Sequence, residues 1–381
     1  MKRLLLVGAG HAHAQVLKDW IGRSVAGCEV TIVSPHAMTP YSGMVPGWLA
    51  GTYRFDEIGI DFAALAAAAG ATFLADPMIG LDPKRRQVLL RGGSALDYDV
   101  LSLNVGSTLT PPVPPPGARA RILSLRPLGE LRRAWDALLG DPQITTSDTA
   151  LVVTAVGGGA AGVESLLATL KRLRSMRPGL PVQGGLITSS ATLLPGLGPA
   201  AARSARAALT AAGVVVQTAR DYDDSLARSS DIVIWATGAE AHPWQRGSGL
   251  AVSDRGFIRV DERLRSCSHP QVHAVGDCAE WTLPLPKAGV FAVRMGPVLS
   301  RNLRAALGAG TPVPYAPQRR YLALLSTANG RAIASWGGWA LEGRWLWRLK
   351  DRIDRAFVRR FVIADPSLTT NPPTPVPGEP V

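Results

Sequence analysis

Two glycine-rich turns, each lying between an apolar run and a helix-compatible stretch, most constrain the fold of this chain. In the first, Leu4–Val7 leads into Gly8-Ala9-Gly10-His11-Ala12-His13 and a helix to Trp20, and Glu29–Val33 follows as a second apolar run. This order is typical of a dinucleotide-binding βαβ unit. Gly8 permits a tight turn, and Gly10 lets the backbone approach a pyrophosphate. The N-terminus of the following helix offers free N–H groups and the positive end of its dipole to the pyrophosphate.

Two positions depart from the usual fingerprint of such a unit. The third glycine position holds His13, and Ser34 stands where an acidic residue normally follows the second strand. A serine hydroxyl can still bond a ribose oxygen, and His13 can pack on a cofactor or a strand. Taken alone, this loop is equally compatible with a nucleotide site and with an ordinary tight turn.

A second glycine-rich turn decides between these interpretations. The apolar run Leu151–Ala155 precedes a complete GxGxxG at Gly157, Gly159 and Gly162. A helix over 165–174, a strand at 186–188, a helix over 199–212 and a strand at 213–216 are predicted after it. Two such units in one chain arise by chance far less often than one, so we predict two dinucleotide sites.

Two later strand ends add candidate cofactor-binding residues. The apolar run 231–236 meets Thr237 and Gly238, and the run 272–275 meets Gly276 and Asp277. Either could be a plain turn or a helix cap. Their position after two glycine loops favours cofactor binding.

Length and composition narrow the alternatives. At 381 residues the chain is long enough for two domains, and no apolar run approaches the ~18 residues of a membrane span. Its three cysteines lack disulfide or metal-ligand spacing, so we expect a reducing compartment. His11 and His13 point to different faces of a helix, and we predict no metal site. The net charge of +12 indicates attraction to an anion without identifying it.

Several motifs carry a family resemblance over roughly residues 1–363. They are Gly10-His11-Ala12-His13, Ser34-Pro35, Thr39-Pro40-Tyr41-Ser42-Gly43-Met44-Val45-Pro46-Gly47, Asn104-Val105-Gly106-Ser107 and Ala334-Ser335-Trp336-Gly337. With the two glycine loops, they resemble the two-dinucleotide-binding-domain flavoproteins of the pyridine nucleotide-disulfide oxidoreductase superfamily. Type II NADH:quinone dehydrogenases and sulfide:quinone reductases are similar. The sequences of these motifs most resemble the FAD-dependent module that is fused ahead of selenide, water dikinase.

The resemblance implies an α/β fold with two Rossmann-like dinucleotide-binding domains, the cofactors FAD and NAD(P)H, and an amphipathic helical segment at the C-terminus. We expect the FAD domain at 1–115 and 252–312, interrupted by an inserted NAD(P) domain at 116–251. A C-terminal segment at 313–363 and a disordered, proline-rich tail at 364–381 follow. Ser34, Pro40, Gly106 and Asp277 are expected beside FAD.

Two residues are candidates for catalysis. Glu164 stands where relatives place a glutamate facing the flavin–nicotinamide junction, although an acid in a first helical turn is also favoured by the dipole. Lys287, in Pro286-Lys287-Ala288-Gly289, resembles a stretch of sulfide:quinone reductases, where a cation would stabilise an anionic reduced flavin. The alternative for Lys287 is a solvated loop lysine.

Two absences shape the expected chemistry. Residues 36–50, where disulfide reductases of this superfamily carry a redox cysteine pair, contain no cysteine, and Cys278 is predicted to be packed. Electrons are therefore expected to leave the flavin directly. The second unit has Thr188-Ser189-Ser190 in place of the usual acid or arginine. The choice of NADH or NADPH, and even nicotinamide binding itself, stays open.

The C-terminal segment raises the question of a membrane. Four tryptophans precede apolar positions spaced three or four residues apart, with basic residues largely between them, within residues 336–363. This pattern predicts a basic amphipathic helix that can lie on an anionic lipid surface. The alternative is that its apolar stripe packs on the FAD domain.

We therefore predict an FAD-dependent oxidoreductase that passes a hydride from NAD(P)H to flavin and on to a small acceptor, most readily a quinone. The alternatives are oxidation of a reduced sulfur or selenium species and a non-enzymatic flavin sensor or membrane adaptor. A nucleic-acid partner is not expected. A homodimer and a separate selenium-metabolism partner stay open. We expect a cytoplasmic location, with peripheral attachment to the inner face of the cytoplasmic membrane as a further option.

Overall fold

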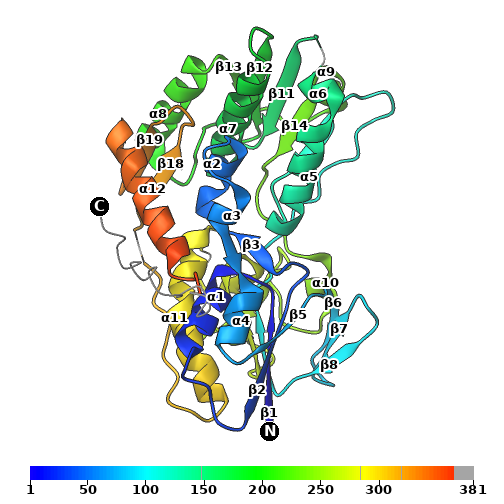
Figure 1. Ribbon diagram of the computed structural model, residues 1–381, viewed down its shortest axis with the longest axis vertical. Coiled ribbons are helices and arrows are strands. Elements are labelled where there is room, and N and C mark those ends of the chain that lie inside the picture. The colour runs from blue at the N-terminus through cyan, green and yellow to red at the C-terminus, as the bar shows by residue number, and fades with distance from the viewer. Residues whose placement is uncertain (147, 284, 319, 364–381) are drawn as a thin grey trace, which may run out of the picture.

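The computed structural model describes residues 1–146, 148–283, 285–318 and 320–363. Two five-stranded parallel sheets form the frame, one above the other in Figure 1. Helices cover both sheets, and the C-terminal helix runs along one side of the molecule, spanning the height between them. The α/β class with two Rossmann-like units is confirmed.

The lower sheet in Figure 1 contains the first glycine turn and has the order β16-β9-β1-β2-β5. Its strands are β1 (Lys2–Val7), β2 (Cys28–Val33), β5 (Thr72–Leu74), β9 (Val100–Leu103) and β16 (Val272–Ala274). Helices α1 (His11–Trp20), α4 (Phe62–Ala68) and α11 (Gly289–Ala306) accompany it. Because β16 joins beside β9, the chain leaves this sheet after Leu103 and returns to it at Val272.

The upper sheet contains the second glycine turn and has the order β10-β14-β11-β12-β13. Its strands are β10 (Arg121–Ser124), β11 (Leu151–Val156), β12 (Val182–Thr188), β13 (Val214–Thr218) and β14 (Ile232–Trp235). Its helices are α5 (Leu128–Gly140), α6 (Pro142–Thr145), α7 (Ala160–Met176), α8 (Gly198–Ala211) and α9 (Asp224–Ser229). Every strand of this sheet falls in the interval between β9 and β16.

Apolar runs explain why these strands are central. Leu4–Val7 of β1 has relative exposures of 2% or less, because helices cover both faces of a parallel sheet. The predicted elements lie where the patterns placed them, with shifted ends. Helix α7, for example, begins at Ala160, five residues before the predicted 165, because it starts directly at the glycine turn.

Smaller elements surround the two sheets. They are β3 (Met38–Pro40) with β4 (Gly59–Asp61), the antiparallel β6 (Met78–Asp82), β7 (Gln87–Leu90) and β8 (Ala95–Asp97), and β15 (Ile258–Val260) with β17 (Ala279–Trp281). The short helices are α2 (Val45–Leu49), α3 (Phe55–Ile58) and α10 (Pro243–Gly247), and 3-10 turns occupy Ser42–Met44 and Gly276–Cys278.

The C-terminal segment is a small antiparallel sheet followed by a helix. It comprises β18 (Ala323–Ser326), β19 (Ala332–Trp336), β20 (Trp339–Gly343) and α12 (Arg344–Arg359). The amphipathic basic helix is therefore present, but residues 336–343, which we assigned to the helical segment, form a hairpin. Gly337 and Gly338 have φ values of +55° and +94° and make its turn.

Helix α12 divides its apolar side chains between two faces. Leu346, Phe357 and the following Phe361 are buried, whereas Leu349 and Ile353 are 36% and 44% exposed. The helix thus packs on the protein and also presents a separate apolar stripe. Within the described ranges, no helix is long and apolar enough to cross a membrane. The predicted disordered tail, 364–381, lies outside the described residues.

Candidate active site

A single large cavity lies where the carboxyl ends of the two sheets face each other. Its volume is about 1820 Å³, and both glycine loops line it. Pockets for one small ligand usually measure roughly 300–1,000 Å³. Ligands of open α/β sheets bind outside the carboxyl ends of the strands. The cavity therefore has the position and the room for two dinucleotides.

The first glycine loop is built around Asn104, at the end of β9. Gly8 has a φ of +98°, and a Cβ atom on Gly8 or Gly10 would overlap Asn104. The Asn104 Oδ1 atom accepts hydrogen bonds from the backbone N–H groups of Ala12 and His13 (3.1 and 3.3 Å). It thereby satisfies two orphan donors of α1.

His13 performs a structural task rather than lining the cavity. Its Nδ1 atom lies 2.7 Å from the Gly8 carbonyl oxygen, and its Nε2 atom lies 2.8 Å from the Ser102 hydroxyl. Burial lowers the pKa of His13 to about 4, so the ring is neutral. The imidazole takes the place of the third glycine and holds the loop to β9 from behind.

In the second glycine loop, the glycines also pack tightly against neighbouring atoms, but here those atoms belong to the backbone. Gly157 has a φ of +122°, and a Cβ atom there would overlap the Ala236 carbonyl oxygen at the end of β14. A Cβ atom on Gly162 would overlap the Gly157 carbonyl oxygen, so helix α7 can approach only with glycine there. At Gly159 a Cβ atom would enter open space. This position lines the cavity and leaves room for a phosphate.

Most of the predicted site residues line the cavity, which brings the residues of both units together. Those on its wall are Gly8, Ala9, Gly10, His11, Ser34, Gly106, Gly157, Gly159, Glu164, Thr237, Gly238, Asp277 and Lys287. Five others do not line it, namely Ala12, His13, Pro40, Gly162 and Gly276. Ala12 and His13 are fully buried behind the wall. The cofactor-binding assignment of these five residues stays a prediction.

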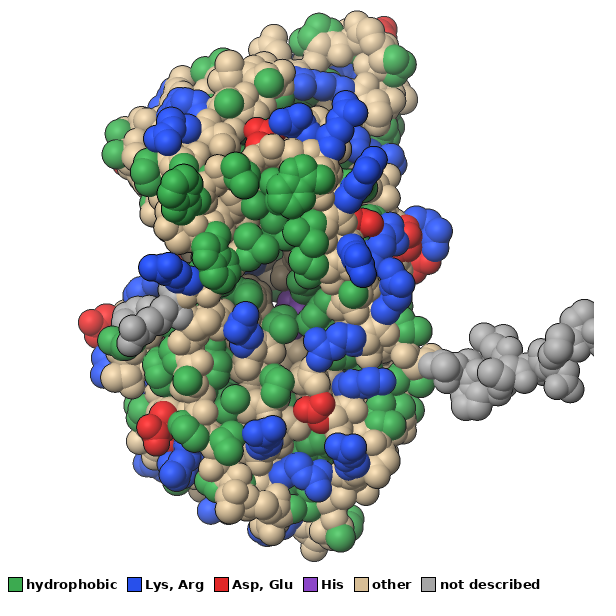
Figure 2. Space-filling view, turned by 90° about the vertical axis from the view of Figure 1, so that its left-hand side faces the viewer, with side chains coloured by type: hydrophobic (Ala, Val, Ile, Leu, Met, Phe, Trp, Pro, Cys, Tyr) green, Lys and Arg blue, Asp and Glu red, His purple; other side chains and the backbone are tan. Residues whose placement is uncertain are grey.

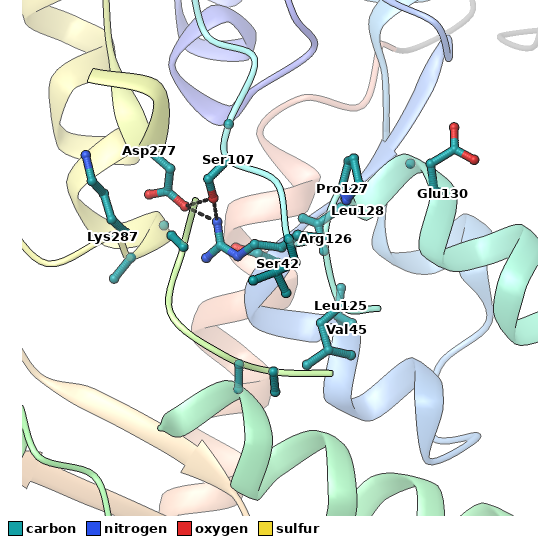
Figure 3. Close-up of a pocket in the computed structure, with 18 of the residues that line it drawn as sticks. Ser42, Val45, Ser107, Leu125, Arg126, Pro127, Leu128, Glu130, Asp277 and Lys287 are labelled. Atoms are coloured by element: carbon teal, nitrogen blue, oxygen red, sulfur yellow. Dashed lines mark hydrogen bonds and ion pairs between the residues drawn. The ribbon is translucent and has the colours of Figure 1, made fainter. Parts of the chain in front are cut away.

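Asp277 faces the cavity with two polar partners (Figure 3). Its Oδ2 atom accepts hydrogen bonds from the Arg126 guanidinium and from the Ser107 hydroxyl, the latter at 3.4 Å. Arg126 also donates to Ser107. Arg126 enters from the end of β10, so the inserted unit supplies a cation to a carboxylate of the first unit. A ligand hydroxyl at Asp277 would share this carboxylate with Arg126.

Lys287 lies on the wall with its ammonium group turned away from Arg126 (Figure 3). The Nζ atom donates to the Ala279 carbonyl oxygen (2.5 Å) and lies 3.7 Å from the ring centroid of Phe257. Burial lowers the pKa of Lys287 to about 8. The lysine is therefore half-buried on the cavity wall, and its role beside a reduced flavin stays a prediction.

Glu164, in the first turns of α7, is half-buried beside an ion pair from α12. Its Oε1 atom accepts a hydrogen bond from the Ser326 backbone N–H (2.6 Å). Lys350 and Asp354 form a buried ion pair at 2.6 Å, and Lys350 also donates to the Gly43 carbonyl oxygen (2.6 Å). Burial raises the pKa of Glu164 to about 7, and the nearby Lys350 charge opposes this rise.

Three aromatic rings line the same end of the cavity. The rings of His11 and Tyr41 lie 5.3 Å apart, and those of Tyr41 and Phe357 lie 4.4 Å apart, between centroids. All three residues and Ile353 line the cavity. Burial lowers the pKa of His11 to about 4 and raises that of Tyr41 above its usual value. This end is therefore apolar, with neutral rings.

The thiols lie apart from the cavity wall. Cys278 is fully buried, and burial raises the pKa of its thiol to about 11. Cys28, Cys267 and Cys278 are all absent from the described residues that line the cavity. A packed role for Cys278 agrees with this geometry.

Four residues that matter to the site were not among the predicted site residues, although Asn104 was part of a motif that carries the family resemblance. They are Asn104, Arg126, Lys350 and Asp354. Asn104 carried a usable signal, because it is a polar residue directly after an apolar strand. The other three depend on contacts between residues more than 100 positions apart, such as Arg126 with Asp277.

Residues 2–296 match the pyridine nucleotide-disulphide oxidoreductase family. Human ferroptosis suppressor protein 1 is 25% identical over 54% of this chain, which spans 57% of that protein's length. A probable NADH dehydrogenase of Dictyostelium discoideum is 22% identical over 73% of this chain and 68% of its own.

Two solved structures share the fold. The sulfide:quinone oxidoreductase of Aquifex aeolicus has a TM-score of 0.73 at 15% identity, covering 97% of this chain and 94% of its own. NDH2 of Plasmodium falciparum in complex with NADH has a TM-score of 0.75 at 15% identity, covering 94% and 98%. The chain belongs to the pyridine nucleotide-disulphide oxidoreductase family. It is a flavin-dependent pyridine nucleotide oxidoreductase that uses FAD and NAD(P)H.

The residues present fit these cofactors. Gly106, Gly159 and Gly238 line the cavity, and a Cβ atom on any of them would meet open space, so the backbone leaves a cradle there. The two glycine loops offer helix N-termini to pyrophosphates. Asp277 would offer a carboxylate to a polyol chain, and Ser34 would offer a hydroxyl to a ribose, since both line the cavity.

Proposed function

We propose that this protein is an NAD(P)H:quinone oxidoreductase whose acceptor enters from the side of α12. The observation that carries the proposal is the continuity of one cavity from the two glycine loops to Ile353 and Phe357 of that helix. Ile353 is also part of the exposed apolar stripe, so the cavity and the stripe meet at this residue. A hydrophobic acceptor would reach the site without crossing open water.

The first loop, Ser34 and Asp277 would hold FAD, and the second loop with Thr237 and Gly238 would hold the nicotinamide dinucleotide. When bound, FAD accepts a hydride from NAD(P)H and passes two electrons to the acceptor. The chain orients the two ligands across one cavity. The apolar rings of Tyr41 and Phe357 exclude water at the acceptor end.

Reduction of a quinone to a hydroquinone takes up two electrons and two protons. The hydride brings both electrons and one proton, so a second proton must come from the protein or solvent. Glu164 lines the cavity, and its raised pKa, about 7, leaves it partly protonated at neutral pH. We assign it to hold this proton, with the Lys350–Asp354 pair as the charged group next to it.

Exposed apolar side chains gather on the face that α12 presents, around a hollow between the two parts of the molecule, and blue cationic groups flank them (Figure 2). We call this patch the C-terminal apolar surface; it comprises Trp336, Trp339, Leu341, Trp345, Leu349 and Ile353. Arg344, Arg348 and Arg352 are exposed within or beside it. Aromatic and basic side chains together are typical of an anionic lipid interface. We propose peripheral attachment through this surface.

Two assays test this proposal separately. The acceptor is tested by reducing the FAD-loaded protein with NAD(P)H without oxygen and then adding a soluble ubiquinone analogue. Return of the oxidised flavin absorbance supports a quinone acceptor, and a stable reduced spectrum contradicts it.

Attachment is tested by sedimentation with vesicles that contain phosphatidylserine. Replacing Arg344 and Arg348 by alanine should weaken binding roughly 30-fold, since each basic residue near such a surface contributes about 1 kcal/mol. The matched control replaces the exposed Lys84 and Arg85, on the β6–β7 turn, and should leave binding unchanged. Equal binding by all three proteins contradicts the assignment of this surface.

A further inference from the structure

The end of β12 is the position that distinguishes the two nicotinamide dinucleotides. In this fold an acid at the end of the second strand bonds the ribose 2′-hydroxyl of NADH, whereas an arginine nearby accommodates the 2′-phosphate of NADPH. Here the strand ends in Thr188, Ser189 and Ser190, all of which line the cavity. Hydroxyl groups thus stand where a carboxylate would favour NADH.

The neighbouring strand supplies a cation at this position. β13 pairs with β12 up to Thr188 and Thr218, and Arg220 follows two residues later. The Arg220 backbone N–H donates to the Thr188 carbonyl oxygen, and the Ala219 backbone N–H donates to the Ser190 carbonyl oxygen, both at 3.0 Å. These bonds fix Arg220 against the end of β12, and its side chain lines the cavity.

The second glycine loop lies directly beside this position. A Cβ atom on Gly158 would come within 2.9 Å of the Thr188 side chain, so the loop and the end of β12 are in contact. A dinucleotide whose pyrophosphate lies on the loop would therefore carry its adenine-side ribose to residues 188–190. The rings of Tyr222 and Trp235, 5.2 Å apart between centroids, line the same region and offer an apolar wall to an adenine.

The charges around Arg220 leave it available to an anion. Its guanidinium donates to the Gln217 side chain and lies 3.6 Å from the Asp223 carboxylate, and its side chain is 39% exposed. Asp223 is also the N-cap of α9, accepting a hydrogen bond from the Leu226 backbone N–H at 3.0 Å. Asp223 can thus orient the Arg220 guanidinium while leaving part of it free to bind an anion. Asp221 lines the cavity too and is the one carboxylate of this loop that could instead serve a ribose hydroxyl.

We infer that the nucleotide site selects NADPH over NADH, with Arg220 and the Ser189 and Ser190 hydroxyls binding the 2′-phosphate. This inference rests on the proposed use of the second loop for a nicotinamide dinucleotide and names which one it takes. A 2′-phosphate carries close to two negative charges and three acceptor oxygens. An arginine fork matches this group in charge and geometry.

Equilibrium binding tests the inference without any turnover. Isothermal titration calorimetry compares adenosine 2′,5′-bisphosphate with adenosine 5′-monophosphate on the FAD-loaded protein. We expect the bisphosphate to bind on the order of 10- to 100-fold more tightly, the range for hydrogen bonds to charged groups. Arg220→Ala should abolish this preference without weakening binding of the monophosphate. Equal affinities in the unchanged protein, or a preference that survives Arg220→Ala, overturn the inference.

Two control variants sharpen this result. Arg228→Ala removes an exposed arginine of α9 that donates to the Pro116 carbonyl oxygen and does not line the cavity, and it should leave the preference intact. Asp221→Asn should also leave the preference for the bisphosphate. If Asp221→Asn raises that preference more than tenfold while Arg220→Ala leaves it unchanged, Asp221 rather than Arg220 sets the choice of dinucleotide, and the assignment to Arg220 fails.

Flavin reduction separates this inference from the proposed function. If NADH bleaches the flavin faster than NADPH at equal concentration, the oxidoreductase function stands and the NADPH assignment fails. If neither dinucleotide bleaches the flavin while the bisphosphate preference and its loss in Arg220→Ala are both observed, the assignment of Arg220 stands and the proposed function fails.

Discussion

Glu164 should make the free energy of unfolding depend on pH, and the substitution Glu164→Gln should remove its contribution to that dependence. Burial raises the pKa of Glu164 from its ordinary value of 4.5 to about 7. Between these values the unfolded chain loses the proton while the folded protein keeps it. The contribution of Glu164 to stability is therefore fully present below about pH 4.5 and is lost as the pH rises through about 7.

The size of the effect follows from the two pKa values. At about 1.4 kcal/mol per pKa unit, the free energy of unfolding should fall by about 2.5 kcal/mol between pH 5 and pH 8 on account of this group alone. The Glu164→Gln side chain keeps an oxygen that can accept the hydrogen bond from Ser326. Unlike the carboxyl group, this amide cannot ionise. The difference in unfolding free energy between the two proteins should therefore shift by about 2.5 kcal/mol in favour of the variant.

Urea unfolding of both proteins at pH 5 and pH 8 measures this shift, and all other titrating groups cancel in the difference. A difference that stays constant within about 0.5 kcal/mol would show that Glu164 ionises normally. The same variant tests the proton assignment. Reoxidation of the reduced protein by a quinone should slow about tenfold per pH unit above pH 7, and Glu164→Gln should remove that limb. An unchanged pH profile refutes the assignment.

Three further predictions concern the framework of the site. Asp354→Ala should lower the free energy of unfolding in urea by about 3–5 kcal/mol, because it leaves the Lys350 ammonium buried and unpaired. The double variant Lys350→Met with Asp354→Leu should lower it much less, since no charge stays buried. Equal losses in the two proteins would contradict the buried pair. Asn104→Ala should lower flavin content measured by absorbance and cost about 1–3 kcal/mol, and full retention would contradict its capping role. Gly157→Ala should destabilise the protein more than Gly159→Ala in thermal unfolding, since only the former clashes with backbone; the reverse order would contradict the loop geometry.

The parts of the fold that the sequence predicted are those that local patterns determine. Gly8 and Gly157 need positive φ values at the end of an apolar strand, and this requirement is visible in a short stretch of residues. The hairpin at β19–β20 was missed although it carried a local signal. Gly337-Gly338 between two apolar segments is a two-residue turn of the kind that hairpins favour.

The parts that could not be predicted depend on register and burial. Arg220 reaches the end of β12 only because β13 pairs with it in one register, which brings together residues about thirty positions apart. Lys350 and Asp354 have the spacing of an ordinary exposed pair on a helix, and only packing of α12 on the rest of the molecule buries them. The spacing of apolar residues along α12 likewise did not predict that Phe357 would be buried and Ile353 exposed.

We propose that electrons pass within one cavity from a nicotinamide dinucleotide, through bound flavin, to a quinone. An anaerobic titration of the FAD-loaded protein with NADPH and NADH, monitored by flavin absorbance and followed by a soluble ubiquinone analogue, tests it most directly. We expect rapid bleaching of the flavin, faster with NADPH than with NADH, and full recovery of the absorbance when the quinone is added. Flavin that neither dinucleotide bleaches, or that stays reduced after the quinone is added, would contradict it.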